Sequence, residues 1–244
     1  MSCYLLPIEK PEAIYTMKVK RYDPESGKGS YWATYQVPYV ATMTVIEALE
    51  YMWDHDEYIS FRANCREFTC GSCAMIINGE PRLACNTLLE DNMTLEPLTR
   101  YSLIKDLVVD TSSVKEKIRE IKYWPETDDR DRDFTVTKEV SEDWHEIYSR
   151  CIECYCCLEA CPMSSSEESK FDGPMHMLQL ARAGRHPLNT SDRVRQASER
   201  GIWACVGCFE CANVCPVNLS PGTEVAKLRR QNILKFFGLG KGSK

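Results

Sequence analysis

Alternation of side-chain type predicts a sheet in the first part of the chain. Residues 31–37 alternate with the period of two that a strand has, and residues 23–30 are rich in Pro, Gly and Ser. Such a segment is expected to turn the strand back on another at residues 17–22. The pattern therefore predicts an N-terminal hairpin.

A capping box predicts a helix after this hairpin. Thr44 precedes Glu47 by three residues, the spacing at which the two side chains satisfy each other's backbone N–H groups. We expect one side of this helix to carry the apolar residues Val45, Ile46, Leu49, Met52 and Trp53.

Further strands are expected around the dipeptide Asn78-Gly79, which is a strong hairpin signal. Residues 75–77 lead into it, and residues 93–98 are predicted to form another strand. Two strands, a helix and then more strands is the order of a β-grasp fold.

The pattern becomes helical after residue 110. Val114, Ile118 and Ile121 recur at helical spacing before Pro125 and a charged stretch at residues 126–133, which we interpret as the interdomain connection. Farther along, Gly173-Pro174 is expected to open a helix with Leu178 and Ala181 on one face and Gly184 as its stop. The predicted fold class is α+β, with a β-grasp domain at 1–112, a linker at 113–142 and an α-helical domain at 143–244.

Composition narrows the function classes. A net charge of -6 gives no support to nucleic-acid binding. No apolar run approaches the roughly 18 residues of a membrane helix, and residues 1–9 lack the basic start and apolar core of a signal peptide. The chain has 14 cysteines, which are therefore expected to be reduced, in a cytosolic compartment, and to serve mainly as metal ligands instead of forming disulfides. The tail after Pro216 is mixed basic and apolar; it is either a solvated helix end or a docking segment for a partner or membrane surface.

The first cysteine group has the plant-type ferredoxin spacing. Cys65-x4-Cys70-x2-Cys73 is followed by a remote Cys85, as in chains that bind a 2Fe-2S cluster through four thiolates. Gly71 lets the backbone come close enough to point N–H groups at sulfur. The alternative is a four-cysteine zinc site, which usually pairs two C-x2-C units.

The other two groups each have the bacterial ferredoxin spacing, x2-x2-x3 followed by proline. In such runs the fourth cysteine binds the other cluster. One 4Fe-4S cluster is therefore expected on Cys151, Cys154, Cys157 and Cys215, and a second on Cys161, Cys205, Cys208 and Cys211.

Several candidate ligands fall outside this register. Cys156 is able to compete as a ligand, but only Cys157 fits the spacing, so we interpret Cys156 as a buried spare thiol. We expect Cys3 to be unused. A Rieske centre needs two histidine ligands, and the histidines of this chain show no ligand spacing, which disfavours such a centre. They are His55, His145, His176 and His186.

The order of these motifs resembles the iron-sulfur subunit of succinate dehydrogenase and fumarate reductase. The resemblance runs from about Met17 to Arg230. The motifs that carry it are Arg21-Tyr22-Asp23-Pro24, Cys65-Arg66, Cys70-Gly71-Ser72-Cys73, Arg82-Leu83-Ala84-Cys85, Lys105-Asp106-Leu107-Val108-Val109-Asp110 and Phe171-Asp172-Gly173-Pro174.

The resemblance implies partners as well as a function. Electrons would pass in turn through the 2Fe-2S cluster, the first 4Fe-4S cluster and the third cluster. They would run between a flavoprotein subunit with covalent FAD, where succinate and fumarate interconvert, and a membrane anchor that handles quinone. Such a subunit is peripheral, on the cytoplasmic side of the cell membrane.

Departures from the family pattern concern the third cluster. Common members lack a cysteine at the position of Cys208 and carry a 3Fe-4S cluster, so Cys208 predicts 4Fe-4S here, as in branches that use a non-classical anchor, methylmenaquinol or thiols. Residues 163–166 replace a tryptophan pair, and Val206 replaces a quinone-site histidine of some members. Phe68 replaces a small residue of the first loop.

Three other functions compete with this interpretation. The chain is alternatively the electron-transfer subunit of another flavoenzyme, thiol- or heterodisulfide-linked, or a ferredoxin that acts alone. The third alternative is a zinc-stabilised interaction module. No acid-base or nucleophile arrangement is visible, so the carbon chemistry is expected in a partner.

Overall fold

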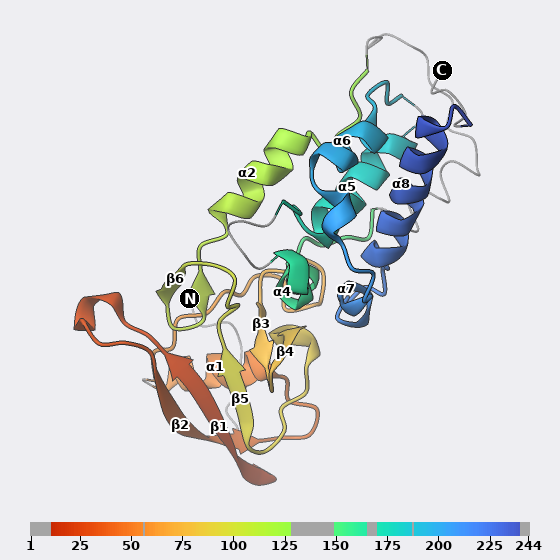
Figure 1. The fold of residues 1–244 in the computed structure, drawn as a ribbon. Helices are drawn as coiled ribbons and strands as arrows, with labels where there is room; N and C mark the ends of the chain where they lie inside the picture. Colours follow the sequence, from red (N-terminus) through yellow and green to blue (C-terminus); the bar gives the residue numbers. More distant parts are fainter. Residues whose placement is uncertain (1–10, 56, 128–148, 165–169, 187, 240–244) are drawn as a thin grey trace. The chain divides into compact units, whose positions relative to one another are not determined.

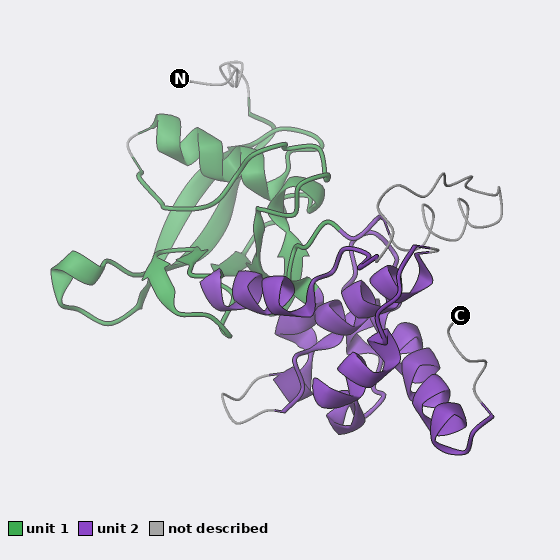
Figure 2. Cartoon of the chain, turned by 90° about the horizontal axis from the view of Figure 1, so that it is seen from above, with its two compact units in different colours: residues 1–111, 152–156 green, residues 112–151, 157–244 purple. Residues whose placement is uncertain are grey.

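The computed structural model describes residues 11–55, 57–127, 149–164, 170–186 and 188–239 (Figure 1). Cys3, His145 and most of the charged stretch after Pro125 lie outside these residues, as do Ser165 and Ser166. The chain divides into two compact units, one formed by residues 1–111 with 152–156 and the other by residues 112–151 with 157–244 (Figure 2).

The first unit is built on a mixed five-stranded sheet of order β2-β1-β5-β3-β4. The predicted hairpin is confirmed, since β1 (Ala13–Arg21) pairs antiparallel with β2 (Tyr31–Tyr39) across the 3-10 helix η1 (Pro24–Ser26). β5 (Met93–Glu96) then pairs parallel with β1, which is the predicted β-grasp arrangement.

The Asn-Gly dipeptide forms the second hairpin of this sheet. β3 (Ala74–Ile77) and β4 (Glu80–Leu83) pair antiparallel on either side of it. Asn78 and Gly79 have φ of 51° and 82°, the two left-handed positions that a two-residue hairpin turn requires. The 3-10 helix η2 (Ala84–Asn86) follows directly and carries Cys85.

The capping box starts helix α1 (Val45–Asp54) as predicted. The Glu47 carboxylate accepts hydrogen bonds from the Thr44 N–H and hydroxyl, each 2.7 Å long. The predicted apolar side is buried except at one residue. Trp53 is 50% exposed, and its indole N–H donates to the carbonyl of the buried Ile59 at 2.6 Å.

A buried carboxylate joins three segments of this unit. Asp106 lies between β6 (Leu103–Lys105) and β7 (Val108–Val109) and is 1% exposed. It accepts hydrogen bonds from Arg21 Nε at 2.8 Å, the Tyr22 N–H at 3.1 Å and the Ser60 N–H at 2.8 Å. The three donors therefore tie the end of β1 and the segment after α1 to this hairpin.

The described part of the second unit is helical and contains no strand. Its core includes Phe171, Met177, Leu180, Ala197 and Ile202. Helices α5, α6 and α8 lie side by side around it (Figure 1). The helices are α2 (Ser112–Ile121), α4 (Cys156–Ala160), α5 (Pro174–Arg185), α6 (Arg193–Glu199), α7 (Glu210–Asn213) and α8 (Pro221–Phe236), with 3-10 turns η4 (Pro162–Ser164) and η5 (Ile202–Ala204).

The predicted helix faces are confirmed in this unit, with one correction. Val114, Ile118 and Ile121 are buried on α2, as are Leu178 and Ala181 on α5. Gly184, however, is not the stop of α5, which continues to Arg185. A Cβ at Gly184 would lie 3.1 Å from the Arg193 Cβ, so the glycine allows α6 to pack closely.

Candidate functional site

The loop between α1 and β3 gathers the first cysteine group. The Thr69 and Cys70 N–H groups both donate to Cys65 Sγ at 3.3 Å. The β3–β4 hairpin folds back so that the Ala84 N–H meets the Cys73 carbonyl at 3.1 Å, which brings Cys85 to hydrogen-bond distance of the Cys73 thiol. Cys65, Cys70, Cys73 and Cys85 are therefore brought together.

The thiols of this group have divergent acidities. Burial pulls the pKa of Cys70 upward, but hydrogen bonds from Ser72 and Cys65 outweigh it and lower the pKa to about 6. Burial raises the pKa of Cys73 to about 12, and the neighbouring thiols of Cys85 and Cys70 add to the rise. A metal that binds all of these sulfurs must displace the Cys73 proton, because thiolates are the ligands.

Left-handed residues shape this loop, and of these only Gly71 was predictable from the sequence. Arg66, Phe68 and Gly71 have φ of 57°, 61° and 69°. Alternating left-handed residues turn successive N–H groups toward one centre, which makes a concave binding surface for an anion. Phe68 therefore adopts a backbone angle that favours glycine and that bulky residues seldom take.

The four predicted ligands of the third cluster line one cavity in the second unit. Cys161, Cys205, Cys208 and Cys211 all face it, together with apolar residues from η4 and from the start of α5 and α8. Burial raises the pKa of Cys211 to about 11, and the charges of Cys161, Cys205 and Cys208 add to the rise. The four predicted ligands thus lie within electrostatic reach of one another.

The second cysteine group is distributed over both units. Cys154 belongs to the first unit, whereas Cys151, Cys157 and Cys215 belong to the second. The Leu219 N–H donates to Cys215 Sγ at 3.3 Å, a contact of the kind that stabilises a thiolate. Cys156 is fully buried, and its hydrogen bond is the largest cause that lowers the pKa of Cys154.

The two bacterial-type runs repeat in conformation as well as in spacing. Glu153 and Tyr155 have φ of 52° and 68°, and Gly207 and Phe209, at the equivalent positions, have φ of 73° and 63°. Both runs therefore present their backbone N–H groups in the same way. Glu153, Tyr155 and Phe209 were also missed by the sequence analysis, because no spacing rule marks them.

The described histidines lie outside the cysteine groups. His55 caps α1 and stacks on Tyr51, His176 is buried in α5, and His186 follows that helix. Among the described residues, no three His, Cys, Asp or Glu side chains are arranged to hold a single metal ion.

The residues present fit iron-sulfide clusters. Each group supplies cysteine thiols, which are the soft anionic ligands that such clusters take. Backbone N–H groups of Thr69, Gly222 and Leu219 donate hydrogen bonds to the sulfurs of Cys65, Cys211 and Cys215. Such donors stabilise the thiolate ligands of a cluster.

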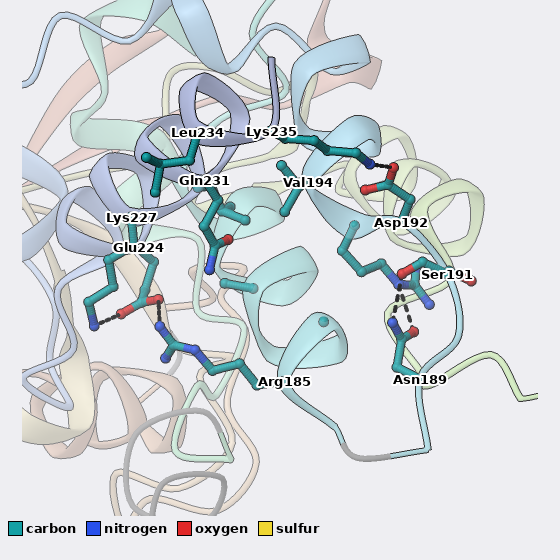
Figure 3. Close-up of a pocket in the computed structure, with 14 residues that line it drawn as sticks. Arg185, Asn189, Ser191, Asp192, Val194, Glu224, Lys227, Gln231, Leu234 and Lys235 are labelled. Carbon is teal, nitrogen blue, oxygen red and sulfur yellow. Dashed lines mark hydrogen bonds and ion pairs between the residues drawn. The ribbon is translucent and has the colours of Figure 1, made fainter. Parts of the chain in front are cut away.

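A larger polar pocket, of about 460 Å³, lies between α5, α6 and α8 (Figure 3). Glu224 binds Arg185 at 3.1 Å and Lys227 at 2.8 Å, and Asp192 binds Lys235, whereas Arg193 pairs with Glu126 outside the pocket lining. No cysteine lines this pocket, so it is separate from the cluster sites.

No helix in the described ranges combines the length and the hydropathy that crossing a bilayer demands.

Comparison with known families agrees with the two-part organisation. Residues 16–116 match a family described as a 2Fe-2S iron-sulfur cluster binding domain. Residues 147–219 match a family described as a 4Fe-4S dicluster domain. The predicted α+β fold class is therefore confirmed.

Curated relatives fall into two length classes. An uncharacterised iron-sulfur protein of Methanocaldococcus jannaschii is 40% identical over 81% of this chain and 39% of its own length. A protein of Methanothermobacter marburgensis, named as one subunit of a fumarate reductase (CoM/CoB), is 32% identical over 87% of the chain and 43% of its own length. The chain thus spans about two fifths of these first relatives.

Other relatives match over nearly their whole length. The fumarate reductase iron-sulfur subunit of Mycobacterium tuberculosis is 33% identical over 87% of this chain and 90% of its own length. Among solved structures, a chain of the Mycobacterium smegmatis Sdh1 complex in the apo form matches with a TM-score of 0.83 and 27% identity, over 92% of this chain and 97% of that one. This chain belongs to the family of iron-sulfur subunits of fumarate reductase and succinate dehydrogenase.

Proposed function

We propose that this chain is the electron-transfer subunit of a fumarate reductase or succinate dehydrogenase complex. It would carry electrons between a FAD-containing flavoprotein, where fumarate and succinate interconvert, and a membrane anchor that handles quinone. The family membership supports this proposal. The observation that carries it furthest is the set of four cysteines around one cavity in the helical unit.

Three clusters are proposed on the cysteine groups. A 2Fe-2S cluster would bind Cys65, Cys70, Cys73 and Cys85; a 4Fe-4S cluster would bind Cys151, Cys154, Cys157 and Cys215; and a second 4Fe-4S cluster would bind Cys161, Cys205, Cys208 and Cys211. When bound, these clusters supply one-electron redox chemistry. The chain's own residues hold them and donate hydrogen bonds to their ligands.

Cys208 decides the type of the third cluster. Its side chain lines the same cavity as the other three cysteines and contributes to the rise in the pKa of Cys211, so it lies within reach of a shared core. Four thiolates support 4Fe-4S, whereas three would leave 3Fe-4S. Cys208 is itself exposed, which leaves this corner of the site open to solvent or to a partner.

A Cys208→Ser substitution tests this assignment. The native oxidised protein is expected to show no 3Fe-4S EPR signal, and the variant is expected to show one, since it retains only three thiolates. Cys156→Ser is the matched control, because this buried thiol lies outside the ligand register. It should leave the spectrum of the third cluster unchanged. A full-occupancy 3Fe-4S signal in the native protein would refute the role of Cys208.

The partners are tested by co-purification under anaerobic conditions. We expect the chain to copurify with a flavoprotein, and the complex to reduce fumarate or oxidise succinate. A copurifying flavoprotein that acts on neither would contradict the proposal and leave the chain in another flavoenzyme complex. A stable monomer in native extracts would favour a ferredoxin that acts alone.

A second candidate concerns the electron donor. The name of the Methanothermobacter marburgensis relative joins fumarate reductase to CoM/CoB, and this favours a thiol-linked complex in place of one that uses quinone. The two candidates differ in one assay. Fumarate reduction by the purified complex should respond to a quinol in the first case and to a thiol pair in the second.

A further inference from the structure

Helix α8 touches the third cysteine run at two places. At its first turn, the Gly222 N–H donates to Cys211 Sγ and opposes the rise in the pKa of that thiol. A Cβ at Gly222 would lie 2.8 Å from Cδ1 of Phe209, so only glycine allows this approach. The helix therefore packs directly against the run, with its N-terminal end at a ligand sulfur.

Two turns farther along α8, Arg229 holds the other end of the run. Its Nε donates to the Ile202 carbonyl at 3.0 Å, and one terminal nitrogen donates to the Trp203 carbonyl at 2.9 Å and to the Cys205 carbonyl. The guanidinium carbon also lies 5.9 Å from the centre of the Trp203 ring. One side chain thus binds the main chain of η5 and that of the first ligand of the run.

These contacts suit arginine in particular. The Ile202 carbonyl also accepts the Cys205 N–H at 3.3 Å, and a planar guanidinium with several N–H groups is able to serve this carbonyl and the two others at once. A lysine has the same charge but offers a single flexible centre. Arg229 is only partly exposed, so solvent screens its charge incompletely.

We propose that Arg229 is the positioning residue of the third cluster: it fixes the main chain at Cys205, and its positive charge favours the reduced cluster. The inference rests on the proposed function, because it requires a cluster on Cys161, Cys205, Cys208 and Cys211. Reduction adds one negative charge to a cluster, so a nearby cation raises its midpoint potential.

The adjacent residue provides a matched control. Arg230 is on the same helix and carries the same charge, but it is exposed to solvent. Arg229→Gln and Arg230→Gln therefore remove equal charge one residue apart. Arg229→Lys keeps the charge and removes the planar fork.

The test is a redox-poised EPR titration of the third cluster in the full chain, purified anaerobically with its partner subunits. Arg229→Gln should shift the midpoint potential to more negative values, and Arg230→Gln should leave it at the native value. Arg229→Lys should keep the native potential with partial loss of the cluster signal. Complete loss of this signal in Arg229→Gln, with the signal retained in Arg229→Lys, would also support the proposal.

Other outcomes would overturn it. If Arg229→Gln retains the cluster at the native potential, or shifts it no more than Arg230→Gln does, Arg229 does not act on the cluster. The proposed function would survive that result. A native protein with no third cluster would instead overturn the proposed function and this inference with it.

Discussion

Aromatic residues at left-handed backbone angles occur in the described chain only within the cysteine runs. Phe68, Tyr155 and Phe209 lie one in each run, with φ between 61° and 68°. Bulky residues adopt such angles at a cost of about 1–3 kcal/mol, which the surrounding structure must offset. These angles turn the neighbouring backbone N–H groups toward the sulfurs.

Some of the left-handed residues were predictable from the sequence, and others were not. Asn78-Gly79 was predictable, because both residue types favour the left-handed angles that their turn needs. The angle of Phe209 was not, because aromatic residues ordinarily avoid that region. Cysteine spacing identified the groups, but the hydrogen bonds around them depend on segments distant in sequence, such as the one from Gly222.

Gly71 carries the clearest prediction at this scale. A Cβ on this residue would lie 2.5 Å from the Ile152 carbonyl oxygen and 3.0 Å from the Cys154 Cα, so the two cysteine loops meet there backbone to backbone. Gly71→Ala should lower the free energy of unfolding of the iron-loaded protein by about 1–3 kcal/mol through overpacking, plus about 1–2 kcal/mol for its left-handed angle. Anaerobic urea unfolding followed by cluster absorbance measures the loss.

Gly79→Ala separates the two contributions. Gly79 has a similar left-handed φ, but nothing lies within 4 Å of the added Cβ. It should therefore cost only the backbone contribution. Equal losses in the two variants would mean that the contact between the loops does not constrain the structure.

Among the elements, the β6–β7 hairpin depends on one buried carboxylate. Replacing Asp106 with Asn leaves the Arg21 guanidinium, whose side chain is 16% exposed, without its anionic partner. The expected loss in the free energy of unfolding is about 3–5 kcal/mol, because the charge that is then unpaired is largely removed from water. Urea unfolding followed by circular dichroism measures it.

An exposed ion pair in the same unit is the control for this substitution. Glu80 pairs with Arg82 at 2.5 Å, and both side chains are more than half exposed. Glu80→Gln should change the stability by less than about 1 kcal/mol. If Asp106→Asn costs no more than this control, the carboxylate does not tie the three segments together.

A buried histidine in helix α5 is expected to make the stability of the fold depend on pH. His176 is 1% exposed, and burial lowers its pKa below the ordinary value of 6.5, against the opposing effect of Asp172. The folded protein therefore keeps this ring neutral while the unfolded chain takes up a proton below pH 6.5. Stability should fall as the pH drops below that value, by at most about 1.4 kcal/mol per pH unit.

His176→Gln removes this contribution. The variant should lose less stability than the native protein between pH 7.5 and pH 5.5, as measured by urea unfolding at each pH. A residual decline is expected from His186, whose pKa burial also lowers. The two proteins should behave alike above pH 7.5, where the ring is neutral in both states. Parallel curves over the whole range would contradict the prediction.

Over the whole molecule, the sequence pattern predicted the order of the helices and strands more accurately than it predicted which side chains pack together. Strand alternation, the capping box and the helical repeat of Val114, Ile118 and Ile121 each predicted an element correctly, because they reflect local physics. Gly184 was misplaced as the stop of α5, because its role depends on the packing of Arg193 from the next helix.

Whether this chain holds three clusters is decided by the iron and acid-labile sulfide content of the anaerobically purified native protein, determined together with EPR of its reduced form. We expect roughly ten iron and ten sulfide per chain and three separate paramagnetic centres. About one zinc per cysteine group, with no sulfide and no EPR signal, would contradict it.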